Sequence, residues 1–269
     1  MARQRKRHVQ TDLFRRTRKR KRGVKLGRRP KGARSSERHK RRETFKSTEP
    51  THVTIRIIDA ARRAAANAVL AKAHTHTKAL PIGSLRKRDM FLALREATIV
   101  VAPREDFHIV QMSIQGTHVH LLVEATSRLA LARGMQAFQV SAAKQINRAL
   151  GQRTGTKCRG SVFADRYHAR ILRSPKQVRN CIAYVLNNWR HHGEHRKRVF
   201  RGMDIDPYST GVTFGGWKQL DGLAWAPLPP ATYRGLVVWL PKSFLLSTLW
   251  RAHGLIDCDE VPGGHPGDE

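Results

Sequence analysis

Cysteine is scarce in this chain of 269 residues, which contains only Cys158, Cys181 and Cys258. An odd number of widely spaced cysteines, with no CxxC pair, argues against a disulfide framework and against a zinc ribbon. Long apolar runs are lacking too, because none approaches the roughly 18 residues of a spanning helix and the N-terminus has no apolar secretion segment. A soluble, cytoplasmic protein without a membrane partner is expected.

Acidic residues are also few. Asp and Glu number 20 against 52 Lys and Arg, which gives a formal net charge of +32 at pH 7. This charge exceeds what solubility requires, so it predicts a polyanionic partner. The charge is concentrated at one end, because residues 1–49 contain 21 Lys and Arg but 4 Asp and Glu.

Residues 1–49 show almost no apolar periodicity and are predicted to form a disordered basic arm. Within the arm, "GRRPKG" is similar to a hook that enters the minor groove of DNA, with Arg28, Arg29 and Lys31 as candidate DNA contacts. Arg29, however, stands where such a hook needs a slim residue. The favoured interpretation is that the arm grips phosphates without reading sequence.

Strand and helix patterns alternate after the arm. Apolar and polar residues alternate as in a strand over 51–58, and further strands are predicted at 106–114, 118–124 and 161–172. Helical signals occupy four others, 60–73, 84–102 after a Ser84 cap, 127–150 after Ser127, and 175–192 after Ser174. This order predicts an α+β fold with a ferredoxin-like antiparallel sheet and helices packed against it.

Two stretches do not join this pattern. Between the first two helices, His74 and His76 lie in a Pro- and Gly-containing loop without an evident strand, so they are expected to be solvated. Residues 196–269 form a C-terminal extension of unassigned role, with one more helix expected near "SFLLSTLWRAHG". The predicted organisation is therefore an arm at 1–49, a domain at 50–195 and this extension.

The stretch "GTHVHLLVE", residues 116–124, places two histidines on a predicted central strand. Side chains alternate along a strand, so His118 and His120 point to one face while Val119 and Leu121 point to the other. Such a pair, taken alone, is more often packing than a metal site. Whether this pair binds a metal depends on which side chains face it from the rest of the fold.

The helix predicted at 175–192 supplies candidate partners. Tyr184 and Asn188 are four residues apart, so they stack one turn apart on the flank of its apolar stripe. Two imidazoles and an amide oxygen could hold a divalent ion, and a phenol could act as nucleophile in phosphoryl transfer. Tyr167, in "DRYHAR", is a rival nucleophile. Its neighbours Arg166, His168 and Arg170 are candidate DNA contacts.

These motifs resemble those of a known family. "GTHVHLLVE" is similar to the His-hydrophobic-His motif of HUH endonucleases, and "YVLNNWRHHG" to the tyrosine helix of single-tyrosine transposases, in particular the REP-associated tyrosine transposases. "VFADRYHARIL" resembles the strand before that helix. The resemblance runs from about Thr51 to Gly193 and continues weakly in "DPYS" and "WRAHGLID". The insertion at residues 59–84 departs from the family pattern.

The resemblance implies a catalytic domain at 50–195 with Tyr184 as nucleophile and His118, His120 and Asn188 as ligands of Mg²⁺ or Mn²⁺. It implies cleavage of single-stranded DNA near hairpins, which leaves a 5′-phosphotyrosine and a free 3′-OH before rejoining. A homodimer and a place at the bacterial nucleoid are expected on this ground alone. The alternative is a protein that binds structured DNA or RNA without cutting it, since the charge would serve that role equally well.

Overall fold

A four-stranded antiparallel sheet lies at the centre of the computed structural model, which describes residues 43–73, 77–164, 166–222 and 233–261. The strands lie in the order β3-β4-β1-β6. Their bounds are Thr51–Arg56 for β1, Phe107–Ile114 for β3, His118–Ala125 for β4 and His168–Ile171 for β6. The first strand of the chain therefore lies inside the sheet, as in a ferredoxin-like fold, and the predicted fold class is confirmed.

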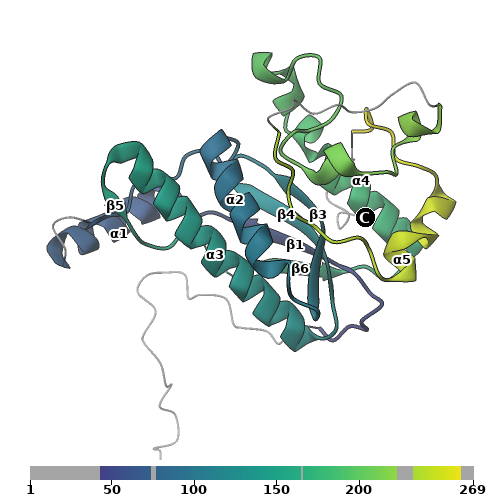
Figure 1. The fold of residues 1–269 in the computed structure, drawn as a ribbon, viewed down its shortest axis with the longest axis horizontal. Coiled ribbons are helices and arrows are strands. Elements are labelled where there is room, and N and C mark those ends of the chain that lie inside the picture. Colours follow the sequence, from purple (N-terminus) through teal and green to yellow (C-terminus); the bar gives the residue numbers. More distant parts are fainter. Residues whose placement is uncertain (1–42, 74–76, 165, 223–232, 262–269) are drawn as a thin grey trace, which may run out of the picture. The chain divides into compact units, whose positions relative to one another are not determined.

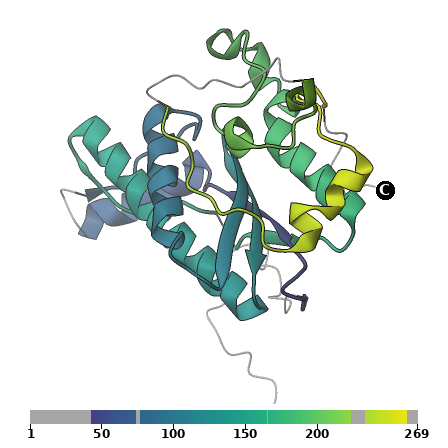
Figure 2. The same cartoon turned by 45° about the vertical axis from the view of Figure 1, so that its right-hand side comes forward.

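Helices cover both faces of the sheet (Figure 1). Their bounds are Ala60–Ala73 for α1, Arg88–Val101 for α2, Arg128–Thr154 for α3, Pro175–His191 for α4 and Phe244–Ser247 for α5. In Figure 2, α2 and α3 lie on one side of the sheet, and α4 lies on the other with the yellow helical turns near the C-terminus. The long helices thus sandwich the sheet.

Strand alternation separates the core into two clusters. Val53, Val119 and Leu121 point toward α2 and α3 and pack in the larger cluster. Leu122 of β4 points the other way and packs against α4. The predicted apolar stripe of α4 is confirmed as buried, namely Val178, Ile182, Val185, Leu186 and Trp189. His118 and His120 share the face of Leu122, so they lie under α4.

Two predicted helix caps are confirmed and one is wrong. The hydroxyl groups of Ser127 and Ser174 accept hydrogen bonds from the first turns of α3 and α4. Ser84 does not cap α2, which begins at Arg88; its hydroxyl instead accepts a hydrogen bond from the Arg86 backbone. The intervening residues stay outside the helix, and the Arg86 side chain donates to the Ile114 carbonyl and to Asp206.

Other predicted bounds shift as well. The strand predicted at 161–172 shrinks to β6, with Phe163 forming an isolated bridge to Ile57. The loop before α2 contains a short strand that was not predicted, β2 at Thr77–Lys78, which pairs in parallel with β5 at Lys157–Cys158. His74 and His76 lie outside the described residues, as do residues 1–42 of the predicted arm.

The last part of the predicted arm is held by the domain. Glu43 and Glu49 both form ion pairs with Arg173, which lies between β6 and α4.

None of the helices in the described ranges has the length and apolar character that a membrane span requires.

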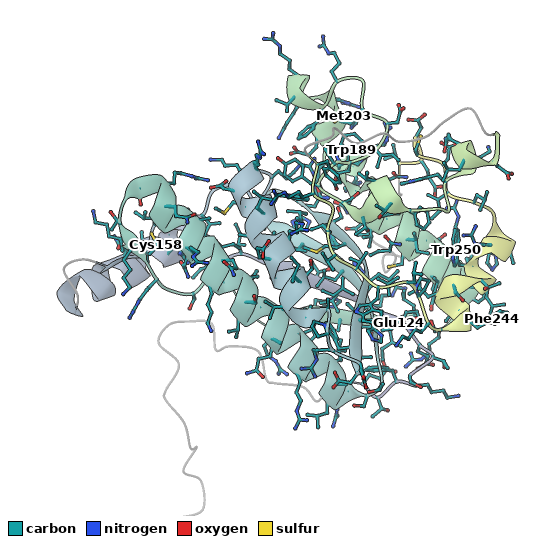
Figure 3. All side chains as sticks on the ribbon, viewed as in Figure 1. Glu124, Cys158, Trp189, Met203, Phe244 and Trp250 are labelled. Atoms are coloured by element: carbon teal, nitrogen blue, oxygen red, sulfur yellow. The ribbon has the colours of Figure 1, made fainter. Side chains whose placement is uncertain are left out.

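The C-terminal extension packs against α4 and along one edge of the sheet. Its expected helix is divided into α5 and a 3-10 turn, Leu249–His253. Four more 3-10 turns precede it, at Glu194–Arg196, Arg198–Phe200, Thr210–Thr213 and Lys218–Gly222. Trp217 and Trp250 are buried with the apolar side of α4. Figure 3 shows Trp250 beside α4.

Hydrogen bonds fix the extension to α4. The side chains of Asn187 and Arg190 donate to the carbonyl oxygens of Asp257 and Cys258, at 2.9 and 2.7 Å. Arg179, nearer the start of the helix, forms an ion pair with Glu260. The helix that carries Tyr184 is therefore held between the sheet and the extension.

The extension also covers the outer edge of β3. The Ile114 amide donates to the Tyr208 carbonyl at 2.9 Å, and the Met112 amide donates to the Thr210 hydroxyl at 3.0 Å. Farther along, the Trp239 amide donates to the Ile109 carbonyl at 2.8 Å. Backbone groups of Ile109, Met112 and Ile114 at this edge are thus satisfied by the chain itself.

Candidate active site

The two histidines of β4 meet beneath α4. His120 is 2 % exposed and His118 is half-buried. Their rings meet edge to face, with centroids 4.8 Å apart. The register of the sheet places Thr54 opposite His120 and Arg56 opposite His118. Strand pairing therefore fixes both imidazoles on the face that α4 covers.

Tyr184 reaches the same point from the helix. Its ring meets the His120 ring edge to face at a centroid distance of 5.2 Å. Ser174 and Pro175 start the helix at a defined residue, which sets which side chains face the sheet. Asn188, one turn after Tyr184, is fully buried. The structure thus brings His118, His120 and Tyr184 together, with Asn188 stacked beside the tyrosine.

Burial controls the protonation of these groups. Desolvation raises the pKa of the Tyr184 phenol, and the nearby Asn188 amide partly offsets this effect. The pKa of His118 is lowered to about 4, first by desolvation and then by the nearby His192 and Arg56. At neutral pH His118 is therefore an uncharged imidazole, the form that binds metals.

We expect His118 to stay unprotonated well below the usual range for histidine. Its pKa of about 4 lies below that of the unfolded chain, near 6.5. Only the unfolded state gains this proton between these values, so the contribution of His118 to stability is full above pH 6.5 and falls as the pH drops toward 4. An NMR titration of the His118 ring checks this, and His192→Ala should raise the measured pKa.

The donor set fits a divalent ion. His118 and His120 offer nitrogen, and the buried amide oxygen of Asn188 accepts no hydrogen bond from any described residue. Imidazole is a better ligand for Mn²⁺ than for the oxygen-preferring Mg²⁺, and an amide oxygen suits both ions. Across the described part of the chain, the only three His, Cys, Asp or Glu ligand atoms that converge belong to Asp257, Cys258 and Asp259. A metal site at His118 and His120 therefore depends on the Asn188 amide oxygen as its third ligand.

Sequence reasoning missed two neighbours of His120. His52 Nε2 lies 3.1 Å from His120 Nδ1, and the Thr54 hydroxyl lies 3.2 Å from the same atom. Both belong to β1, which the sequence showed as alternating, with His52 and Thr54 on its polar side. The pairing of β1 with β4 was the missing information, since it alone brings that polar side to His120.

The rival tyrosine lies elsewhere. Tyr167 is buried in the core cluster that faces α2 and α3. His168 and Arg170, which follow it, lie on the face of the sheet that α4 covers, because His168 pairs with Thr54 and Arg170 pairs with His52. Tyr167 and Tyr184 are therefore in different core clusters, on opposite faces of the sheet.

The predicted DNA contacts divide into described and undescribed groups. Arg166 and His168 are exposed, and Arg170 is half-buried. His168 and Arg170 line a cleft of about 400 Å³ along the edge strand β6. Arg128 and Arg173 also line this cleft, together with Glu43, the ion-pair partner of Arg173. Arg28, Arg29 and Lys31 lie outside the described residues.

Comparison with known proteins gives two findings. Residues 84–188 match the family model described as "Transposase IS200 like". A solved structure, described as the REP-associated tyrosine transposase bound to a REP hairpin, is 15 % identical, with 74 % of this chain and 99 % of that chain covered and a TM-score of 0.42. No curated protein matches.

The matched stretch begins before α2 and ends at Asn188, so it contains β3, β4, α3 and most of α4. His118, His120, Tyr184 and Asn188 all fall within it. Over residues 84–188 the chain is thus similar to the IS200-like transposases, and the resemblance that its sequence motifs indicated is confirmed.

Proposed function

We propose that this protein is a metal-dependent transposase-like endonuclease that cleaves and rejoins single-stranded DNA, with Tyr184 as nucleophile. The observation that carries the proposal is the contact between the Tyr184 and His120 rings, which joins α4 to the histidine face of the sheet. A phenol beside two imidazoles and a buried amide is an arrangement suited to phosphoryl transfer.

Each residue has a role in this reaction. His118, His120 and Asn188 would hold Mg²⁺ or Mn²⁺, which when bound supplies Lewis-acid polarisation of a phosphate oxygen. The Tyr184 oxygen forms a bond to phosphorus and loses its proton, while the bond from phosphorus to the 3′ oxygen breaks. The departing oxygen takes a proton and becomes a 3′-OH. Reversal by a 3′-OH rejoins DNA and releases the tyrosine.

The basic cleft along β6 suits the DNA beside the scissile phosphate. The register of the sheet links this cleft to the site, because His168 pairs with Thr54, and Thr54 pairs with His120 on its other side. Arg170 lies opposite His52 on the same face. Cations at these positions would hold the phosphates of the strand near Tyr184.

One observation favours the alternative of a binding protein that does not cut. Tyr184 is only 8 % exposed and its pKa is raised, so its phenol is a poor nucleophile without a metal and an aligned phosphate. The test is incubation with a labelled hairpin oligonucleotide and Mn²⁺, followed by a denaturing gel. A covalent adduct supports the enzyme, whereas binding without adduct under any divalent metal supports the binder.

We expect His118→Ala to abolish cleavage and to weaken Mn²⁺ binding at least about tenfold, since one of three donors is lost. Asn188→Ala should have a smaller effect, because water can replace an amide ligand. His118 is half-buried, so its removal should disturb packing less than removal of the buried His120. Calorimetric titration with Mn²⁺ and the gel assay check both. Full activity of His118→Ala in EDTA would contradict the metal site.

Deleting residues 1–42 should weaken DNA binding broadly and reduce its salt dependence. Each lost phosphate contact should remove roughly 0.9 from the slope of log affinity against log salt on duplex DNA, or about 0.7 on single strands. Fluorescence anisotropy at several salt concentrations measures this. A change of preferred sequence with unchanged affinity at high salt would instead show that the arm reads bases.

A further inference from the structure

Two side chains of β1 contact His120 at one ring nitrogen. His52 Nε2 and the Thr54 hydroxyl lie 3.1 and 3.2 Å from His120 Nδ1. The centroids of the His52 and His120 rings lie 5.3 Å apart, and the ring planes differ by 23°. His52 is 3 % exposed, so these contacts lie inside the protein. Two independent contacts on one nitrogen fix the rotation of the ring.

These contacts also bear on which nitrogen carries the proton. A neutral imidazole has one N–H, and the other nitrogen keeps a lone pair. If His120 Nδ1 carries the proton, it can donate to His52 Nε2 or to the Thr54 oxygen, both of which can accept. If Nδ1 instead accepts, the proton sits on Nε2, and that nitrogen cannot bind a metal.

We propose that His52 and Thr54 are positioning residues that hold His120 with its proton on Nδ1, which leaves the Nε2 lone pair for the metal. The inference rests on the proposed function, in which His120 is a ligand. A ligand histidine commonly donates its second N–H to a neighbouring acceptor, which orients the ring and fixes its tautomer. Here the acceptors are an imidazole and a hydroxyl from the adjacent strand.

The family match does not supply this role. It begins at residue 84, whereas β1 ends at Arg56. His52 and Thr54 are connected to the site only through the register of β1 with β4, where Thr54 stands directly opposite His120 and His52 opposite Leu122. The strand thus contributes to the site although the motifs lie elsewhere.

The first test reads the tautomer directly and needs no metal. Long-range ¹H–¹⁵N spectra of the metal-free, ¹⁵N-labelled full chain should show His120 protonated on Nδ1. In the double variant His52→Leu/Thr54→Val, which removes both acceptors, the Nε2–H form should appear. A wild-type His120 protonated on Nε2 would overturn the proposal.

The second test measures Mn²⁺ affinity by calorimetry. The double variant should bind roughly 10- to 100-fold more weakly, the usual cost of losing such outer partners. His52→Gln keeps an acceptor oxygen and should stay within about threefold of wild type, a rescue that a purely structural role would not produce. Unchanged affinity in the double variant would contradict the proposal.

A matched control separates positioning from loss of a buried histidine. His108 is 4 % exposed on β3 and contacts Lys242 and Trp239. His108→Leu should leave Mn²⁺ affinity unchanged, even if the melting temperature falls. Failure of the wild-type chain to bind Mn²⁺ would count against the proposed function, while the tautomer still decides the positioning role. If the double variant does not fold, the wild-type spectrum and His52→Gln decide it.

Discussion

Replacing Tyr184 with phenylalanine is expected to eliminate the covalent DNA adduct and to reduce strand cleavage by a factor on the order of 10³ or more, because the nucleophilic oxygen is lost. The ring remains, so its contacts with His120 and His52 should persist. DNA affinity and melting temperature should therefore stay close to those of the wild type. Denaturing gels on a hairpin substrate, with binding measured in parallel, check the result.

Tyr167→Phe is the matched control. Tyr167 is buried to a similar extent as Tyr184, at 9 % against 8 % exposed, but it lies in the other core cluster. Its variant should still form the adduct. An adduct that survived in Tyr184→Phe and vanished in Tyr167→Phe would move the nucleophile to the segment before β6.

Asp206→Ala should destabilise the fold by up to about 3–5 kcal/mol, the usual cost of breaking a buried ion pair, because Arg86 would keep only its longer ion pair with Glu194, at 3.3 Å. Asp206 is fully buried and its two carboxylate oxygens accept hydrogen bonds from Arg86, at 2.9 and 2.8 Å. The same guanidinium lies over the rings of Phe200 and Tyr208 and donates to the Ile114 carbonyl. The pair therefore anchors the extension to the end of β3.

Urea unfolding measures this loss, with a surface ion pair as control. Arg104 and Asp106 form a pair whose side chains are 30 % and 40 % exposed, so Asp106→Ala should cost about 1 kcal/mol or less. Replacing both buried partners, as Arg86→Met/Asp206→Leu, should be milder than Asp206→Ala, because Glu194, which also pairs with Arg86, keeps its ion pair with Lys197. Equal losses of unfolding free energy in Asp206→Ala and Asp106→Ala would mean that the buried ion pair stabilises the fold no more than the surface pair does.

Local patterns predicted the elements that position the site. Strand patterns identified β1, β3 and β4, and the caps Ser127 and Ser174 identified the starts of α3 and α4. The spacing of Tyr184 and Asn188 placed both on one side of a helix. These features depend on residues close together in the chain, so the sequence alone contains the information.

Features that depend on distant pairing were not predicted. The contacts of His52 and Thr54 with His120 require the register of β1 against β4, across 68 and 66 residues of chain. The ion pair of Arg86 with Asp206 joins residues 120 positions apart. Nothing in the local pattern of either partner shows which other residue it will meet.

The edge of β3 has a consequence for self-association. An uncovered edge strand offers unpaired backbone groups to another chain, and β3 is an eight-residue strand of mostly apolar residues, which is the kind of segment that nucleates aggregates. Tyr208, Thr210 and Trp239 occupy that edge with backbone and hydroxyl groups. A chain shortened before residue 206 would lack these contacts, so we expect it to expose the edge of β3 and to aggregate more readily than the full chain.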